Sequence, residues 1–386
     1  MTKEIIDFYV KNIDKNSKPL IGTIEFLNWA KNKNISMAVC TNKQEHLAID
    51  LLKKLDIYKY FEYVAGCDTF SFNKPDPLNL TIVIEIINVD SSQVYKGMDI
   101  GSAKPTKEIL NKIKHRLINI RDPSESYSVA DFVIDAQKEM KEIVDQGKIP
   151  LLVGGAMLYF KALLGGLADN PPADFSMRKK IEADALLYGW PHLYRKLKKI
   201  DPELAKELHP NNSQRIQRAL EIFYITGQTP SAIKKDQKKY GSKITPISNS
   251  YRIIQIALIP SERAYLHERI EKRFKKILDT GFEAEVRLLH ERSDLNENLP
   301  AMRAAGYKQM WSYLTGTINY NEIADLSNAA TRQLAKRQLT WLKKWPHLQK
   351  IQIDRYNDEK DYSNNKVLSD CLSILKRQNI YTDICQ

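Results

Sequence analysis

The chain has 386 residues, of which 43% are apolar and 27% are charged. This length and balance exclude a disordered chain or a miniature scaffold, and they fit one large domain or two to three smaller ones. No run of about eighteen apolar residues occurs, and the first residues are charged where a signal peptide needs an apolar stretch. We therefore expect a cytoplasmic protein without a membrane span.

Cysteine spacing and charge narrow the function classes. The four cysteines are far apart and form no CxxC pair, so the sequence predicts neither a disulfide framework nor a zinc site. The formal net charge is +12, and residues 1–80 carry 11 basic and 10 acidic side chains, so the excess lies beyond them. This excess suits a polyanionic partner such as nucleic acid, although many basic proteins bind none.

The first eighty residues predict an α/β segment. The apolar run at 35–40 indicates a strand, residues 41–57 have apolar side chains at helical spacing, and 61–68 indicate a second strand. Thr41 lies between the first strand and the helix, where a hydroxyl either caps the helix or contacts a phosphate. The sequence leaves both roles open.

Two short motifs in this segment resemble the haloacid dehalogenase-type phosphatases of the phosphoglycolate phosphatase kind. They are Cys40-Thr41-Asn42 and the stretch NKPDP at 73–77. The resemblance implies that Thr41 and Lys74 contact phosphate. The DxDxT motif that supplies the nucleophile and the later GDxxxD motif are both absent, and an acyl-phosphate mechanism needs that carboxylate. We interpret residues 1–82 as an incomplete haloacid dehalogenase-like α/β segment, and a phosphatase is the least favoured function.

The pattern changes near residue 83. An apolar strand at 82–89 leads into DSSQVYKGMDIGSAKP from Asp90 to Pro105, and HRLINIRDPSESYSVADF follows from His115. A second strand, IPLLVGG, ends in Gly154-Gly155, where the missing side chains let a ligand or another backbone come close. Residues 174–240 predict helices rich in Lys and Arg, and GFEAEVRLL, RAAGYKQMWSYL and TRQLAKRQLTWLKKW follow.

These motifs, in this order over about residues 84–345, resemble the tRNA dimethylallyltransferases. The resemblance implies an α/β fold with a P-loop NTPase-like parallel sheet, a helical insertion at about 174–240 and C-terminal helices, together forming a domain at 83–350 before a tail at 351–386. It implies transfer of a dimethylallyl group from dimethylallyl diphosphate to N6 of adenosine 37, in tRNA reading codons that begin with U. It also implies nucleotide (ATP-type) binding, Mg²⁺ and tRNA as partner, and we expect a monomer.

By this resemblance Asp90 is the catalytic base that binds N6, although an Asp after a strand often caps a helix instead. Ser91, Ser92 and Gln93 complete the stretch that contacts tRNA in the family. By the same resemblance Ala156 is expected to contact tRNA. It stands where the family has a Thr, so one hydroxyl donor is missing near the diphosphate or the incoming nucleotide. Arg178 is near the place of a basic residue that faces substrate.

Three basic clusters are predicted to bind RNA, because cations with amides or aromatic rings grip phosphates and splayed bases. Each of these clusters is also compatible with a solvated basic face. The tryptophans of the last cluster are expected in the core. The three clusters are Gln214, Arg215, Ile216, Gln217 and Arg218; Arg303, Gly306, Tyr307 and Lys308; and Lys336, Arg337, Gln338, Thr340 and Lys343.

One departure from the family concerns the diphosphate. The pattern G-x-x-x-x-G-K-[ST], expected about twenty residues before Asp90, occurs nowhere in the sequence. One alternative is that two truncated proteins are joined near residues 80–88. The other is that the strand, turn and helix at 35–57 take the place of the family's first strand, phosphate-binding loop and helix, and offer Thr41 to phosphate. The first alternative leaves open whether the chain transfers a prenyl group or is an inactive tRNA-binding remnant.

Overall fold

The computed structural model describes residues 12–13, 15, 17–33, 35, 37–41, 43–66, 84–167, 170–240, 245–260, 262–353 and 366–377. The chain forms two compact units. Unit 1 comprises Met1–Tyr127, Asp135–Met157 and Ile254–Gln386, and unit 2 comprises Ser128–Ile134 and Leu158–Ile253. The two units are described separately.

The N-terminal segment is a small α/β arrangement. Helices α2 (Thr23–Asn32) and α3 (Glu45–Lys54) accompany strands β1 (Ala38–Cys40) and β2 (Tyr63–Ala65). The two strands pair in parallel, with Val39 opposite Val64. This confirms the predicted order of strand, helix and strand. Among the described residues β1 pairs with β2 alone, so the structure does not place it in the sheet that precedes Asp90.

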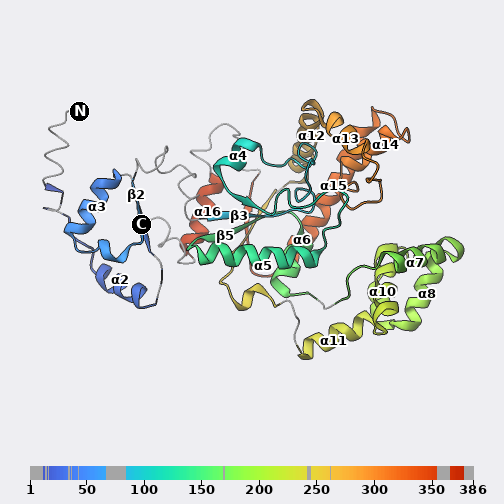
Figure 1. Ribbon diagram of the computed structural model, residues 1–386, viewed down its shortest axis with the longest axis horizontal. Coiled ribbons are helices and arrows are strands. Elements are labelled where there is room, and N and C mark those ends of the chain that lie inside the picture. Colours follow the sequence, from blue (N-terminus) through green and yellow to red (C-terminus); the bar gives the residue numbers. More distant parts are fainter. Residues whose placement is uncertain are drawn as a thin grey trace. The chain divides into compact units, whose positions relative to one another are not determined.

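A three-stranded parallel sheet carries the Asp90 motif. Its order is β4 (His115–Arg116), β3 (Ile84–Val89) and β5 (Ile149–Gly154), with helix α5 (Val129–Asp145) along it (Figure 1). Because β3 and β5 run parallel and Val89 lies opposite Gly154, the residues that follow both strands meet at one edge of the sheet.

A buried ion network ties this sheet to α5. The carboxylate of Glu85 in β3 accepts hydrogen bonds from Arg116 at 2.8 Å and from Lys148 at 2.7 Å, and Arg116 also pairs with Glu139 and Glu142. Burial alone favours the neutral carboxyl, but these donors outweigh it and lower the pKa of Glu85 to about 2.

The rest of unit 1 is a second parallel pair with helices. Strand β6 (Gln255–Ile259) pairs with β7 (Leu348–Gln352). The helices are α4 (Lys107–Lys112), α12 (Arg263–Asp279), α13 (Phe282–His290), α14 (Tyr307–Leu314), α15 (Glu322–Lys343) and α16 (Lys366–Arg377). The edge-to-face rings of Phe282 and Tyr307, with centroids 5.1 Å apart, join α13 to α14.

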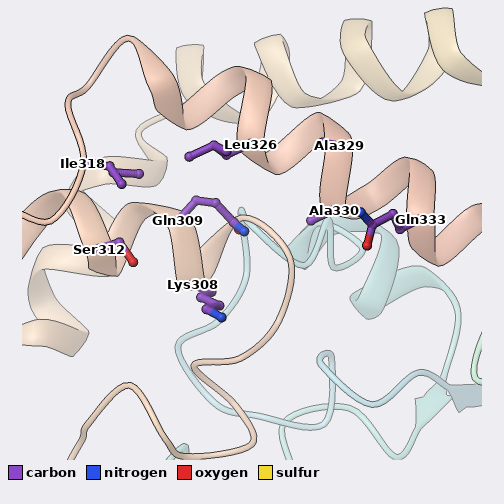
Figure 2. Close-up of a pocket in the computed structure, with 8 residues that line it drawn as sticks. All are labelled: Lys308, Gln309, Ser312, Ile318, Leu326, Ala329, Ala330 and Gln333. Atoms are coloured by element: carbon purple, nitrogen blue, oxygen red, sulfur yellow. The ribbon is translucent and has the colours of Figure 1, made fainter. Parts of the chain in front are cut away.

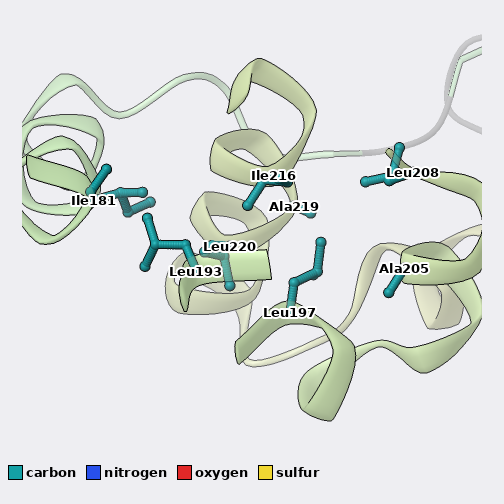
Figure 3. Packing of buried hydrophobic residues seen from close by; sticks show 9 residues of the cluster. Ile181, Leu193, Leu197, Ala205, Leu208, Ile216, Ala219 and Leu220 are labelled. Carbon is teal, nitrogen blue, oxygen red and sulfur yellow. The ribbon is translucent and has the colours of Figure 1, made fainter. Parts of the chain in front are cut away.

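Unit 2 is built on helices. Helix α6 (Met157–Gly165) precedes α7 (Phe175–Tyr188), α8 (Trp190–Ile200), α9 (Pro202–Glu207), α10 (Ser213–Thr226) and α11 (Pro230–Tyr240). Asp174, Asp201 and Asn212 cap α7, α9 and α10, since each side chain accepts a backbone N–H of the first turn. Figure 3 shows the apolar core between α7, α8 and α10, formed by Ile181, Ala185, Leu193, Leu197, Ala205, Leu208, Ile216, Ala219 and Leu220.

The structure confirms the α/β class, with short parallel sheets and many helices. The helical insertion is present, and unit 2 extends beyond the predicted 174–240 on both sides. No helix in the described part of the chain is long and apolar enough to cross a membrane.

Candidate active site

Asp90 follows β3 and opens a tight loop. Its Oδ1 accepts the backbone N–H of Ser92 at 2.7 Å and that of Gln93 at 3.3 Å. Within the described part of the chain, no group binds Oδ2. The loop therefore fixes the carboxylate through one oxygen, and Ser91 is exposed beside it.

The end of β5 packs against this loop. A Cβ on Gly154 would lie 2.0 Å from the Val89 oxygen, so no other residue fits this approach. The N–H of Ala156 donates to the same oxygen at 3.1 Å. Gln338, from α15, donates its Nε2 to the Gly155 oxygen at 2.9 Å. Two residues that the sequence predicted for RNA contact, Ala156 and Gln338, thus lie next to the Asp90 strand.

Gln93 connects the Asp90 loop to the turn that follows it. Its Nε2 donates to the oxygens of Ser102 at 3.2 Å and Ala103 at 3.4 Å. Lys104, whose side chain is buried, continues the connection by donating to Asp99 Oδ1 at 2.6 Å and to the Tyr95 oxygen at 2.8 Å. The segment from 90 to 104 is therefore one hydrogen-bonded unit.

Arg273 of α12 adds a cation beside this segment. Its Nη2 donates to the Ser102 oxygen at 3.5 Å, and its charge interacts with Asp90. Surrounding protein desolvates the guanidinium and lowers its pKa, while Asp90 acts in the opposite direction; the side chain still reaches solvent. Desolvation leaves a guanidinium charged at neutral pH, so Arg273 remains a cation able to stabilise a nearby anion.

The cluster around Tyr307 differs from the sequence prediction. Tyr307 is fully buried, and its hydroxyl donates to Glu285 Oε1 at 2.5 Å. A ring in this position does not stack on a base, so that part of the prediction is corrected; the burial follows from packing on Phe282. Gly306, with φ of +90°, is the N-cap of α14, and Arg303 and Lys308 are exposed on either side.

A pocket of about 340 Å³ lies between α14 and α15 (Figure 2). Lys308 and Gln309 approach it from α14, and Leu326 and Gln333 from α15. Polar and apolar groups both line it, as in many sites for small ligands or bases. The full lining is Lys308, Gln309, Ser312, Ile318, Leu326, Ala329, Ala330 and Gln333.

Helix α15 has an exposed basic surface. Lys336, Arg337 and Lys343 are all exposed. Thr340 is also exposed, and its hydroxyl donates to the Lys336 oxygen of its own helix at 2.8 Å. The tryptophans predicted to be core are only half-buried, and Trp345 donates its Nε1 to Gln255 at 2.6 Å.

In unit 2 the predicted arginines converge on one buried carboxylate. Glu221, with 0% of its surface exposed, accepts from Arg178 Nε at 2.9 Å, from Arg218 Nη1 at 2.7 Å and from the Asp174 N–H at 2.8 Å. Burial raises the pKa of Glu221, but the hydrogen bonds from these donors lower it by more, so the net shift is downward. Arg178 and Arg218 thus neutralise an internal charge, and each remains only partly exposed.

The other members of this cluster divide between surface and core. Gln214 and Arg215 are exposed on α10, and Gln217 donates to Glu182 at 2.8 Å. Ile216 is fully buried in the apolar core of unit 2 (Figure 3), so its side chain does not contact RNA as predicted. Its position one residue from Arg215 on a 3.6-residue helix turns it inward.

Of the two predicted phosphate ligands, Thr41 is described and Lys74 lies outside the described residues. Thr41 Oγ1 accepts the Lys43 N–H at 3.2 Å, and its own N–H donates to the Ala65 oxygen at 2.9 Å. The hydroxyl therefore closes a local turn, three residues before the N-cap of α3 at Gln44.

Comparison with known families agrees with this geometry. A sequence model of the IPP transferase family matches residues 93–345, and one of the haloacid dehalogenase-like hydrolases matches residues 1–96. The chain belongs to the IPP transferase family. It is therefore a prenyltransferase by family, and the resemblances inferred from the motifs are confirmed.

Solved structures give the same answer. A tRNA isopentenylpyrophosphate transferase from Bacillus halodurans is 30% identical, with a TM-score of 0.52; the match covers 90% of this chain and 98% of that one. The corresponding enzyme from Staphylococcus epidermidis is 32% identical, with a TM-score of 0.50 and 78% and 94% coverage. A eukaryotic dimethylallyltransferase acting on tRNA is 24% identical over 89% and 80%, and its TM-score of 0.59 indicates likeness of fold.

Sequence reasoning missed three charged residues, two beside the Asp90 segment in unit 1 and one inside unit 2. Glu285 belongs to the GFEAEV motif. That motif contributed to the family resemblance, but it indicated no role for this carboxylate. Arg273 lies in a charge-rich stretch of α12 and Glu221 lies in α10, and nothing in their sequence surroundings distinguishes them from solvated charges. Their roles follow from contacts across the fold.

Proposed function

We propose that this chain transfers a dimethylallyl group from dimethylallyl diphosphate to N6 of adenosine 37 in tRNAs that read codons beginning with U. The family performs prenyl transfer, and the proposal specifies the prenyl donor, the acceptor atom N6 and position 37 of the tRNA. The names of the similar solved enzymes, which act on tRNA, support this substrate. We expect the reaction in the cytoplasm.

The observation that carries the proposal is the Asp90 carboxylate. It lies at the carboxyl end of a parallel strand, a usual place for catalytic groups in α/β proteins, and its loop holds Oδ1 while Oδ2 is available. A carboxylate in this arrangement accepts a proton from a base placed against Oδ2.

The reaction requires one bond to form and one to break. N6 of the adenine attacks C1 of the dimethylallyl group, the C1–O bond to diphosphate breaks, and the proton of N6 passes to Asp90. The leaving diphosphate gains negative charge, which Arg273 beside Asp90 is placed to stabilise. The adenosine has to leave the stack of the anticodon loop to reach Asp90.

The family resemblance implies Mg²⁺ as a companion of the diphosphate, but the residues that the structure describes do not provide the expected protein ligands for it. In the described part of the chain no group of three or more His, Cys, Asp or Glu side chains is placed to hold a metal ion. The protein ligands expected from a G-x-x-x-x-G-K-[ST] loop are likewise absent from the sequence. No step of the proposal therefore runs through the metal.

Exposed cations support tRNA binding in each unit. Arg215 is exposed in unit 2, and Lys308, Lys336, Arg337 and Lys343 are exposed in unit 1. Phosphate contacts of such side chains give affinity that falls as salt rises. The pocket beside Lys308 offers both apolar and polar groups to an unstacked base.

The experiment measures transfer of labelled dimethylallyl from its diphosphate to unmodified tRNA carrying A36 and A37. The purified chain is compared with Asp90→Ala. Asp99→Ala, which removes a carboxylate paired with Lys104 in the turn that follows the Asp90 loop, serves as a control for local structural damage. We expect the rate to fall by about 10²- to 10⁴-fold in Asp90→Ala, the range of general base catalysis. An Asp90→Ala rate equal to wild type would refute the assignment.

A second candidate function is favoured by the absent phosphate-binding pattern. A chain that binds tRNA without transferring the prenyl group is an inactive remnant of the same enzyme. Salt-sensitive tRNA affinity with no labelled product would identify it. Transfer by the wild-type chain would exclude it and show that another segment holds the diphosphate.

A further inference from the structure

Glu285 collects an unusual set of donors. Its Oε2 accepts the backbone N–H groups of Asp99 at 2.9 Å and Ile100 at 2.7 Å, and its Oε1 accepts that of Gly101 at 3.1 Å. The Tyr307 hydroxyl donates the fourth hydrogen bond to this carboxylate, also at Oε1. One carboxylate from α13 thus binds three successive amides of a turn about 185 residues away in sequence.

The turn is also fixed sterically. A Cβ on Gly101 would lie 2.2 Å from a ring carbon of Phe282 and 2.6 Å from ring carbons of Tyr307, so the turn reaches its place only with glycine there. Phe282 and Tyr307 are themselves fully buried. The contact therefore combines charge-assisted hydrogen bonds with close packing.

From this turn the connection runs to the catalytic loop. The next two residues, Ser102 and Ala103, present the carbonyl oxygens that bind the Gln93 side chain, and Ser102 also accepts from Arg273. Gln93 in turn donates its N–H to Asp90 Oδ1. Three contacts thus separate Glu285 from the proposed base.

We propose that Glu285, anchored by the Tyr307 hydroxyl, is a positioning residue that holds the Asp99–Gly101 turn and thereby sets the Asp90–Gln93 loop. Because Tyr307 lies between Gly306 and the exposed Lys308, the same contact ties a predicted RNA-binding segment to the catalytic loop. The inference rests on the proposed function for its catalytic consequence, and on contacts alone for the order of the loop.

The kinetic test compares Glu285→Gln with Glu283→Gln. Glu283 lies on the same helix and pairs with Arg287 at the surface, so its variant controls for loss of charge on α13. We expect Glu285→Gln to lower kcat by about 10²-fold with KM for tRNA changed less than twofold, since a misplaced base slows chemistry more than binding. Glu285→Asp should recover part of the loss, and Tyr307→Phe, which keeps the ring, should lower kcat by less than Glu285→Gln.

Two results would overturn the inference: an unchanged kcat in Glu285→Gln, or an equal loss in Glu283→Gln. If the wild-type chain transfers nothing, hydrogen exchange decides without turnover. Glu285→Gln should then speed hydrogen exchange of the amides of Asp99, Ile100 and Gly101 and also of the amides of Ser92 and Gln93. In Glu283→Gln these amides should exchange at the wild-type rate. Unchanged exchange at Ser92 and Gln93 would remove Glu285 from the control of the loop whatever the chain's activity.

Discussion

Glu285 in unit 1 and Glu221 in unit 2 are two carboxylates that each gather several donors, with different consequences. Glu285 binds backbone N–H groups and a tyrosine hydroxyl, and so orders a loop. Glu221 binds two arginine side chains and one N–H, and so neutralises charges inside a helical bundle. The kind of donor decides the role: a carboxylate that binds amides fixes the backbone, whereas one that binds arginines leaves them fewer free N–H groups for an outside partner.

The largest effect on stability is expected at Glu221. Glu221→Gln leaves the partly exposed Arg178 and Arg218 without their buried counter-charge. At about 1.5 kcal/mol for each weakened charge-assisted hydrogen bond, it should lower the free energy of unfolding by about 3 kcal/mol. Urea unfolding followed by circular dichroism measures it. Glu203→Gln, which removes an exposed partner of Lys235, is the control and should cost less than about 1 kcal/mol. Equal losses in the two variants would mean that Glu221 is no more than a surface charge.

The buried carboxylate of β3 sharpens the comparison through pH. Because the pKa of Glu85 is lowered to about 2 from an ordinary 4.5, its contribution to stability is present above pH 4.5 and is lost as pH falls toward 2. The shift corresponds to about 3 kcal/mol. Unfolding free energies of Glu85→Gln should therefore vary less with pH between 4.5 and 2 than those of wild type, whereas Asp145→Asn, in an exposed pair, should follow wild type. A Glu85→Gln curve parallel to wild type would contradict the ion network.

Packing beneath the Glu285 turn gives a smaller effect. Gly101→Ala forces a methyl group against the rings of Phe282 and Tyr307 and should destabilise the chain by about 1–3 kcal/mol. Thermal unfolding measures the loss. Gly165→Ala, at the end of α6 with open space around its Cβ, should be neutral or slightly stabilising. If Gly101→Ala leaves the unfolding temperature unchanged, the turn can shift at little cost. That result would argue against a turn held in place by Glu285.

The smallest effect concerns RNA affinity and separates held from exposed arginines. Arg215→Gln should lower the slope of log K against log salt for tRNA by about one, the value for one lost phosphate contact. Arg218→Gln should change the slope less, because Glu221 and the Pro171 oxygen already engage that guanidinium. Filter binding at several salt concentrations tests both variants. Equal slopes for the two variants would mean that the pairing of Arg218 with Glu221 does not reduce its contact with RNA.

Much of the architecture was predictable because it is encoded locally. Apolar runs of strand length predicted β1, β3 and β5, and helical spacing predicted α3 and the insertion. Asp90 was located by its place after a strand within a long motif. Its bonds to Ser92 and Gln93, two and three residues on, involve only near neighbours in sequence.

The burial of residues in the predicted RNA-binding clusters was anticipated less well, because exposure is not a local property. Within Gln214–Arg218 the sequence treats all five residues alike, but the structure buries Ile216, holds Arg218 on Glu221 and exposes Arg215. Within Arg303–Lys308 it buries Tyr307 between two exposed cations. Burial depends on which helix packs opposite, and no spacing rule within one segment states that.

By itself the sequence determined the family, the strand and helix order, the position of Asp90 and the absence of a G-x-x-x-x-G-K-[ST] pattern, since each is a matter of residue identity and short-range order. The tertiary structure alone decided which charges are used internally. Glu285 meets the Asp99–Gly101 turn, Arg273 meets Ser102, and Glu221 meets Arg178, each across more than forty residues. A carboxylate binds whichever donors the fold brings within about 3 Å, and only the packed chain sets that distance.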